Sequence, residues 1–384
     1  MQNILFLLDN PYSIDRRVIR EAESLQKTGL YNVIVVATKS EGYANEELMN
    51  GVVVRRIFNS DIFDIKNYSA SKKYALQIHK EFQFDIIHAH DQVMLNVAIK
   101  LKKLTEKKVI YDSHELFRCW PLNTSTKGFT LFKSKIVRKL LINREAKNIK
   151  NIDGLIAVNE SIQNDIITNF KLKLPSVSIR NVPELPLNTF FSNILREEFK
   201  VSDETKLLVY IGAHVYPRTI NIEQVIDHFA NKENTVFIII SKKNWAQIEV
   251  EKYVKLVNAK NIFFRDVVAP SDILKYLSSA DVGIVSSWNK KDLSYWYGLD
   301  NKLFEYMMSE VPILATKQPE YVRIVEEYQI GKCIDPDKEN FYDNFLQIIS
   351  KKEYYKNNIQ STKKVLNWEI ESLKLLEFYK AMLF

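Results

Sequence analysis

Residues 297–316 have the sequence Tyr-Gly-Leu-Asp-Asn-Lys-Leu-Phe-Glu-Tyr-Met-Met-Ser-Glu-Val-Pro-Ile-Leu-Ala-Thr. This stretch predicts a loop, a short helix from about Asn301, and a buried strand over 311–316. Such a helix turns its N-terminus toward the carboxyl edge of a parallel sheet, where free backbone N–H groups suit a phosphate. Lys302 would add a positive charge there, and Glu305 could accept hydrogen bonds from two sugar hydroxyls. The alternative is an ordinary amphipathic helix with two solvated charges.

The rest of the chain repeats this alternation of strand and helix. Short apolar runs predict strands at 4–8, 33–37, 84–89, 109–111, 207–211, 235–240 and 282–285, and helical spacing predicts helices at 68–82, 93–104, 220–229 and 248–257. We expect Ser271 to cap a further helix that ends at Leu277. The pattern indicates an α/β fold with parallel sheets covered on both faces.

At 384 residues the chain exceeds the usual size of one hydrophobic core, so two domains are expected. The prolines between 180 and 186 are typical of a linker. We predict an N-terminal Rossmann-like domain over 1–185 and a C-terminal one over 186–364. A final helix over 365–384 is long enough to return toward the first domain.

The formal net charge of +7 is distributed unevenly. Residues 1–185 hold 28 Lys and Arg against 20 Asp and Glu, whereas the rest of the chain holds 26 against 27. Eight of these basic residues fall within 127–150, where an apolar stripe accompanies them. The segment 133–150 could lie on an anionic membrane, or it could pack its stripe on the domain and expose its lysines. No zinc spacing or other nucleic-acid-binding motif is present, so no nucleic-acid partner is predicted.

Cys119 and Cys333 are too few for a disulfide framework or a thiolate metal site, which fits a reducing compartment. No apolar run is long enough for a signal peptide or a membrane span. We expect a cytoplasmic protein whose contact with the inner face of the membrane, if any, is peripheral.

Polar candidates follow the predicted strands, at the expected ligand-binding edge of each sheet. In the first half they are Asn10, Tyr12, His90, Asp91, His114 and Glu115, and in the second half Arg218, Arg265 and Val267 with the 297–316 stretch. We expect the two sheets to face one interdomain cleft. Within it, His114 is the first choice for a catalytic or acceptor-side contact, because imidazole can relay a proton near neutral pH.

Two further expectations concern metals and phosphates. His88 and His90 are two apart on a strand, and we predict that they point to opposite faces and form no chelating pair. Arg218 and Lys302 would supply two positive charges that stabilise a leaving diphosphate without a metal. Since the chain has only nine glycines and no Gly-x-Gly-x-x-Gly, Walker or Asp-x-Asp motif, helix termini and side chains must supply the phosphate contacts.

Four segments stand out together. They are Asp-Arg-Arg-Val-Ile-Arg-Glu-Ala at 15–22 with Leu25 and Gly29, Phe-Asp-Ile-Ile-His-Ala-His-Asp at 84–91, Tyr-Asp-Ser-His-Glu at 111–115, and Asn-Lys-Leu-Phe-Glu-Tyr-Met at 301–307. This combination, which spans both halves, resembles the family 4 glycosyltransferases of the GT-B fold. The resemblance implies a retaining, metal-independent transfer of a sugar from a nucleotide diphosphate donor in the C-terminal domain to an acceptor in the N-terminal domain, with no cofactor.

The resemblance also implies roles for particular residues. Arg218 and Lys302 contact the donor diphosphate, Glu305 binds the ribose, and His114 lies beside the transferred sugar. We assign donor binding to Arg218, Arg265, Val267, Tyr297, Asn301, Lys302, Leu303 and Glu305, and the acceptor side to Asn10, Tyr12, Arg16, His90, Asp91 and Glu115. The catalytic residues would be His114, Arg218 and Lys302, and no metal site is assigned.

Three positions depart from the family pattern. Tyr297 stands where many members have the first of two glutamates, which touches the donor sugar. Ala213 replaces a frequent arginine. Asp300 replaces a frequent proline, and its carboxylate could compete with phosphate for the helix N–H groups.

The leading hypothesis is a hexosyltransferase-type enzyme of cell-surface polysaccharide or lipopolysaccharide synthesis that acts on a glycan or lipid-linked acceptor. A nucleotide-sugar epimerase of the same fold is the alternative enzyme, although it needs further acid/base carboxylates. A catalytically silent GT-B binding protein is the alternative without catalysis, favoured by Tyr297 and Ala213.

Overall fold

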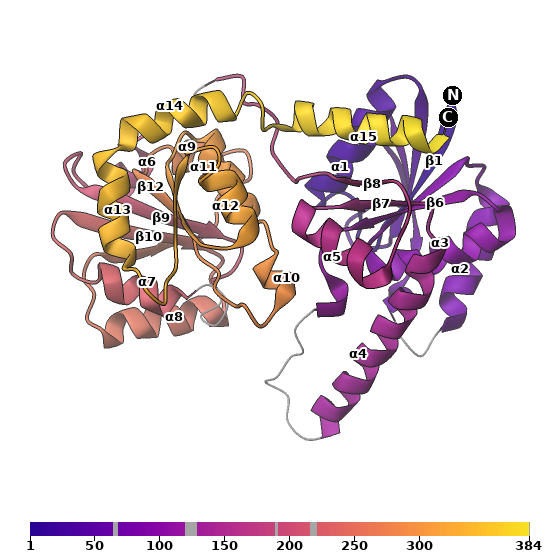
Figure 1. Cartoon of the computed structure of the whole chain (residues 1–384), viewed down its shortest axis with the longest axis horizontal. Helices are drawn as coiled ribbons and strands as arrows, with labels where there is room; N and C mark the ends of the chain where they lie inside the picture. Colours follow the sequence, from indigo (N-terminus) through magenta and orange to yellow (C-terminus); the bar gives the residue numbers. More distant parts are fainter. Residues whose placement is uncertain (64–67, 120–128, 189–190, 216–220, 384) are drawn as a thin grey trace. The chain divides into compact units, whose positions relative to one another are not determined.

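The computed structural model describes residues 1–63, 68–119, 129–188, 191–215 and 221–383 (Figure 1). The chain forms two compact units. Unit 1 comprises Met1–Asn181 and Glu371–Phe384, and unit 2 comprises Val182–Ile370. The boundaries of these units therefore fall at 181/182 and 370/371, a few residues from the predicted domain limits of 185/186 and 364/365. The last helix begins with residues of unit 2 and continues as part of unit 1.

Unit 1 is built on an eight-stranded sheet in the order β3-β4-β2-β1-β5-β6-β7-β8. Its strands are β1 (Gln2–Leu7), β2 (Tyr31–Thr38), β3 (Glu46–Met49), β4 (Val52–Phe58), β5 (Ile86–His90), β6 (Lys108–Ser113), β7 (Gly154–Ala157) and β8 (Ser176–Ser178). All neighbours are parallel except β3 and β4. The strand order reverses between β1 and β5, which creates a topological switch point where such sheets bind ligands.

The helices of unit 1 are α1 (Arg16–Lys27), α2 (Tyr68–Glu81), α3 (Asp91–Thr105), α4 (Phe129–Asn148), α5 (Glu160–Phe170) and most of α15 (Trp368–Leu383), with short 3-10 turns at Ser60–Phe63, Phe117–Cys119 and Ile149–Asn151. Helix α1 begins because the Asp15 carboxylate accepts a hydrogen bond from the Val18 N–H at 3.2 Å. Gly29, with φ of 68°, then turns the chain into β2.

Helix α15 packs directly against the sheet of unit 1 at Gly154, the first residue of β7. A Cβ at this glycine would lie 2.9 Å from the Phe378 ring and 3.0 Å from the Met382 side chain. The guanidinium of Arg180, which follows β8, pairs with Glu371 of α15 at 3.4 Å. The C-terminal residues are therefore a layer of unit 1 rather than an appendage.

Unit 2 has a six-stranded, fully parallel sheet in the order β11-β10-β9-β12-β13-β14. Its strands are β9 (Lys206–Gly212), β10 (Thr235–Ser241), β11 (Ile262–Arg265), β12 (Val282–Val285), β13 (Ile313–Thr316) and β14 (Gly331–Ile334). Its helices are α6 (Ile194–Glu198), α7 (Ile222–Phe229), α8 (Trp245–Leu256), α9 (Ile273–Leu277), α10 (Leu293–Trp296), α11 (Asn301–Met308), α12 (Pro319–Val325), α13 (Phe341–Ser350) and α14 (Lys352–Thr362). Here the switch point lies between β9 and β12.

Tyr306 fixes α11 on this sheet. Its ring lies over Gly283 of β12, where a Cβ would approach the ring to 2.4 Å. Its hydroxyl accepts a hydrogen bond from the Ile211 N–H at 3.0 Å and lies 3.2 Å from the carbonyl oxygens of Val209 and Ile284. One side chain thus joins α11 to both strands of the switch point.

The predicted α/β fold with two Rossmann-like sheets is confirmed, as is the loop, helix and strand order of 297–316. The strand is two residues shorter than predicted. The predicted cap at Ser271 is wrong: α9 starts at Ile273, and Asp272 stands in the N-cap position without a side-chain cap bond.

Candidate functional site

Lys302 places a positive charge at the switch point of unit 2. Its side chain is only 13% exposed, and its Nζ lies 3.3 Å from the Tyr210 hydroxyl and 3.3 Å from a carboxylate oxygen of Asp300. Burial opposes the charge, but Asp300 and Tyr210 outweigh it and raise the pKa of the ammonium above its ordinary value. Lys302 is therefore a fixed cation in the first turn of α11.

Asp300 occupies the N-cap position of α11, yet its side chain makes no cap hydrogen bond. The carboxylate pairs with Lys302 instead. In this structure the Asp300 carboxylate does not occupy the helix N–H groups for which it could compete with a phosphate. An anion at this helix end would meet backbone N–H groups and the Lys302 ammonium together.

The other residues assigned to donor binding differ in what they offer. Leu303 is fully buried, so its side chain serves the core. The Arg265 guanidinium bonds to Glu198, to the Tyr276 hydroxyl and to the Asp266 carbonyl, and Val267 is 45% exposed. Asn301 is exposed, Tyr297 and Glu305 are half-buried, and Arg218 lies outside the described residues.

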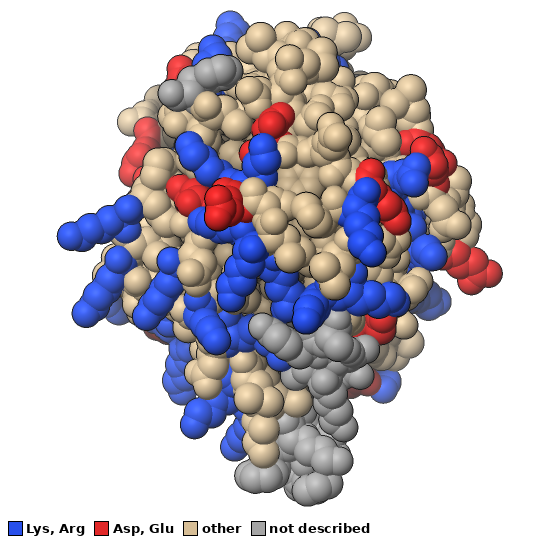
Figure 2. Space-filling model, turned by 90° about the vertical axis from the view of Figure 1, so that its right-hand side faces the viewer, with Lys and Arg blue, Asp and Glu red and all other residues tan. Residues whose placement is uncertain are grey.

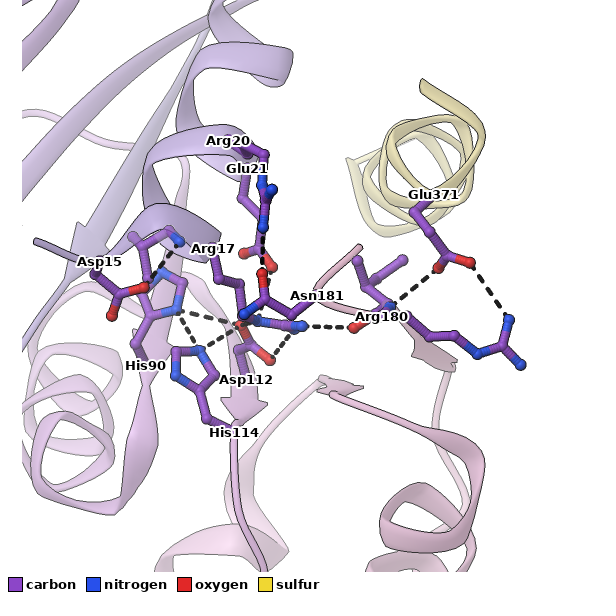
Figure 3. A network of polar contacts seen from close by, with 12 residues as sticks. Asp15, Arg17, Arg20, Glu21, His90, Asp112, His114, Arg180, Asn181 and Glu371 are labelled. Carbon is purple, nitrogen blue, oxygen red and sulfur yellow. Dashed lines mark hydrogen bonds and ion pairs between the residues drawn. The ribbon is translucent and has the colours of Figure 1, made fainter. Parts of the chain in front are cut away.

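In unit 1, a buried polar network surrounds Asp112 at the end of β6 (Figure 3). The carboxylate lies 2.9 Å from Nη2 of Arg17, 3.1 Å from Nε2 of His114 and 3.2 Å from Nδ1 of His90. Burial opposes ionisation, but Arg17 and His114 hold the pKa of this carboxyl well below its usual range. Asp112 is therefore an anion that gathers side chains from α1, β5 and the loop after β6.

His114 lies between two carboxylates. Its Nε2 is 3.1 Å from Asp112 and its Nδ1 is 3.3 Å from Asp91, while the His114 N–H donates to Asp91 at 3.1 Å. Burial lowers the pKa of the imidazole, but the two carboxylates outweigh this effect and raise it to about 10. The two carboxylates therefore favour the imidazolium form of His114 at neutral pH.

The prediction that His88 and His90 point to opposite faces is wrong. Side chains at i and i+2 of a strand share a face, and the two rings stack with centroids 4.2 Å apart. The Nδ1 atom of His88 contacts the Tyr379 hydroxyl of α15 at 2.7 Å. Burial lowers the pKa of both histidines, so they are neutral beneath the charged Asp112.

Among the described residues, one group brings metal-binding side chains close together: Glu21, His88, His90 and Asp112, whose ligand atoms lie within 4.8 Å of one another. The Arg17 guanidinium already supplies a positive charge to this group. The Arg17 guanidinium pairs with Asp112 at 2.9 Å and with Glu21 at 3.0 Å. We therefore describe these residues as a polar core rather than as metal ligands.

The acceptor-side residues also separate into structural and accessible groups. Asn10 closes a turn, since its Oδ1 accepts from the Tyr12 N–H and its Nδ2 donates to Asp15, both at 2.9 Å. Tyr12 is fully buried with φ of 72°. Arg16 and Glu115 are exposed. The network contains the neighbouring Arg17 instead of Arg16, as the i, i+4 spacing of Arg17 and Glu21 beside the buried stripe of α1 could have indicated.

Asp9 was not among the assigned residues, although it lies two residues after the end of β1 at the switch point. It is half-buried, and burial together with the nearby Asp91 raises the pKa of its carboxyl to about 6. Asp91 itself is 38% exposed and is held by His114. Both carboxylates are accessible hydrogen-bond acceptors at this edge.

Lys and Arg side chains are prominent on the face of unit 1 shown in Figure 2. On α4, Ile136, Val137 and Leu140 are 45%, 37% and 50% exposed, and Lys135, Arg138 and Lys139 are their neighbours in the sequence. Their apolar stripe is thus partly open to solvent. Among the described residues, no helix combines the length and the apolar composition that a membrane span requires.

Comparisons with known proteins now complement this geometry. Residues 14–181 match the family model Glycosyltransferase Family 4, and residues 205–351 match the model Glycosyl transferases group 1. A comparison with curated protein sequences finds no match.

Solved structures match along the whole chain. Sucrose-phosphate synthase from Thermosynechococcus elongatus is 14% identical with a TM-score of 0.76, covering 100% of this chain and 99% of that one. The Anabaena protein Alr3699/HepE in complex with UDP-glucose is 15% identical with a TM-score of 0.73, covering 99% and 100%. A UDP-forming trehalose-phosphate synthase from Burkholderia xenovorans is 11% identical with a TM-score of 0.73, covering 100% of both chains.

Proposed function

This chain belongs to the GT-B glycosyltransferases, with a Glycosyltransferase Family 4 domain followed by a Glycosyl transferases group 1 domain, and we propose that it moves a sugar from a nucleotide diphosphate to a glycan or lipid-linked acceptor. Unit 2 binds the donor and unit 1 binds the acceptor. The transfer proceeds with retention, without a metal and without a cofactor, and it serves the synthesis of a cell-surface polysaccharide.

The observation that carries this proposal is the buried Lys302 ammonium at the N-terminus of α11, beside the switch point of a parallel sheet. A departing nucleoside diphosphate develops negative charge, and a fixed cation with backbone N–H groups stabilises that charge without reorganising. Arg218 would add a second cation. Glu305, one turn along α11, is placed to accept hydrogen bonds from the ribose hydroxyls.

Unit 1 suits an uncharged acceptor. Its accessible groups at the switch point include the carboxylates of Asp9 and Asp91, which accept hydrogen bonds from sugar hydroxyls and repel phosphates. His114 keeps Asp91 in place, since its ring and its backbone N–H both face that carboxylate. The hydroxyl that attacks the donor would therefore belong to a sugar rather than to a phosphate.

A lipid-linked acceptor would bring the protein to a membrane, and α4 offers a surface for it. The exposed Ile136, Val137 and Leu140 lie among lysines and arginines, the composition of helices that lie in the interface of anionic bilayers. Flotation with vesicles of phosphatidylcholine, with and without phosphatidylglycerol, tests this surface. Equal recovery with both vesicles would remove the membrane from the proposal.

The donor is tested by a thermal-shift screen of UDP-, GDP- and ADP-sugars, followed by an assay of sugar release. A stabilising nucleotide sugar that is slowly hydrolysed, with excess chelator present, supports the transferase. Conversion of the donor into its epimer without acceptor would instead indicate an epimerase, and no response to any nucleotide would indicate a binding protein without catalysis.

Three variants connect this assay to the site. Lys302→Ala should reduce turnover, and Glu305→Ala should weaken nucleotide binding. Lys252→Ala is the matched control, because its ammonium is exposed on α8 and pairs with Glu249 in the preceding turn. Wild-type kinetics in both site variants would refute the assignment of the donor site.

A further inference from the structure

An aromatic pair lies in the segment that leads from β12 into α11, with Trp288 in a loop and Trp296 at the end of the short helix α10. The rings of Trp288 and Trp296 meet edge to face, with centroids 5.3 Å apart and an angle of 66° between their planes. Both side chains are half-buried. The Lys290 ammonium lies 4.2 Å from the Trp288 ring centre and 5.8 Å from that of Trp296. The protein thus builds an ordered aromatic surface on a loop outside the core.

Hydrogen bonds fix this pair at the carboxyl edge of the sheet. The loop begins at Ser287, whose N–H and carbonyl both bond to the Thr316 hydroxyl at the end of β13. The Trp288 indole N–H donates to Asp337, just beyond β14, at 2.9 Å. The pair therefore belongs to the β12–β14 side of the switch point, and only four residues separate Trp296 from α11.

The order of the strands suggests how a nucleotide sugar would be oriented along the carboxyl edge of this sheet. Arg265 and Val267, which we assigned to donor binding and here take to face the base, lie at the end of β11 and just beyond it. This strand is at one end of the order β11-β10-β9-β12-β13-β14. Lys302 marks the diphosphate at the switch point in the middle. A nucleotide sugar that extends along the carboxyl edge, with its base toward β11, therefore carries its sugar toward the loop of Trp288 and Trp296.

The position of Tyr297 strengthens this reading. Where relatives of this pattern use a carboxylate to touch the donor sugar, this chain has Tyr297 directly after Trp296. A pyranose ring presents C–H groups that pack on an aromatic face. A carboxylate instead accepts hydrogen bonds from the hydroxyls of the sugar. Lys290 and Asp337 are 53% and 66% exposed and lie 4.0 Å apart, so a ligand can displace this lysine at small energetic cost.

We propose that Trp288 and Trp296 form the surface on which the sugar of the donor packs, in place of the missing carboxylate contact. This inference rests on the proposed transferase function and names the residues that recognise the donor sugar. The aromatic pair binds the hexose through shape and C–H contacts, and Lys290 moves off the rings when the donor enters.

The test compares a nucleotide sugar with the nucleotide alone. Calorimetry measures the Kd of UDP-glucose and of UDP, and of GDP-mannose and GDP, for the wild type and for Trp288→Leu and Trp296→Leu. We expect each variant to lose about tenfold in affinity for the nucleotide sugar, as for one lost aromatic contact, while the Kd of the nucleoside diphosphate stays within about twofold. Trp296→Phe should restore most of the loss, and Trp245→Leu, at an exposed position on α8, is the control.

Each other outcome overturns the inference in a recognisable way. Equal losses for the nucleotide sugar and the nucleoside diphosphate would place the base or the phosphates on the tryptophans. Unchanged donor affinity with a raised KM for acceptor would assign the pair to the acceptor. A wild type that binds none of the UDP-, GDP- and ADP-sugars of the thermal-shift screen refutes the proposed function itself, and the inference with it.

Discussion

Raising the pH should release the proton that His114 shares with Asp91 and Asp112. Its folded-state pKa of about 10, against an ordinary value of 6.5, corresponds to about 5 kcal/mol of interaction, at about 1.4 kcal/mol for each pH unit. Because the pKa is raised in the folded state, this stabilisation is complete below pH 6.5 and is lost as the pH rises through 10. Unit 1 should therefore weaken steadily between pH 6.5 and 10.

The direct assay is an NMR titration of ¹⁵N-labelled histidine side chains. The chain has six histidines, and a His114→Gln variant assigns the signal of His114. We expect both ring nitrogens of His114 to stay protonated up to about pH 9, and we expect Asp91→Asn to move its titration toward neutral pH. A wild-type His114 that titrates near 6.5 would refute the reasoning, because it would mean that the two carboxylates do not hold the ring.

Hydrogen exchange of unit 1 between pH 6.5 and 10 measures the effect on stability. Burial raises the pKa of the Glu21 carboxyl to about 8. Because this carboxyl ionises more readily in the unfolded chain, it also lowers the stability of unit 1 as the pH rises from 4.5 to 8. The difference between wild type and His114→Gln isolates the contribution of His114. His79→Gln, an exposed substitution on α2, is the control that should keep the wild-type slope.

Three further substitutions test how the sites are held. Tyr306→Phe should destabilise unit 2 by about 1–3 kcal/mol in urea unfolding, because the Ile211 N–H loses its buried acceptor, and an unchanged transition midpoint would contradict this role. Gly283→Ala should displace the Tyr306 ring, which a Cβ would meet at 2.4 Å, and should reduce nucleotide affinity together with stability; intact affinity would show that α11 does not depend on this contact. Tyr379→Phe should cost unit 1 about 1–3 kcal/mol, since buried His88 would lose its hydrogen-bond partner, whereas unchanged hydrogen exchange across β5 would show that α15 does not support it.

The sequence predicted the elements whose signals are local. The helix at 301–308 follows from its apolar spacing. Lys302 could also be identified, because a cation in the first turn of a helix after a parallel strand has a recognisable place in the fold. These features depend on residues that are neighbours in the chain.

The features that sequence reasoning missed depend on contacts across the sheet. Arg17 was passed over for Arg16, since only the docking of α1 on β6 shows which of the two reaches Asp112, 95 residues away. The error over His88 and His90 was one of periodicity, because alternate residues of a strand share a face. Nothing local indicated that Tyr379 would contact His88 from the far end of the chain.

That contact has a consequence for biosynthesis. The residues of unit 1 are interrupted by the whole of unit 2, since 371–384 complete the fold that begins at Met1. During translation every residue of unit 2 is made before α15 can cover β7 and supply Tyr379, so a nascent unit 1 lacks the contact between His88 and Tyr379 until α15 has left the ribosome.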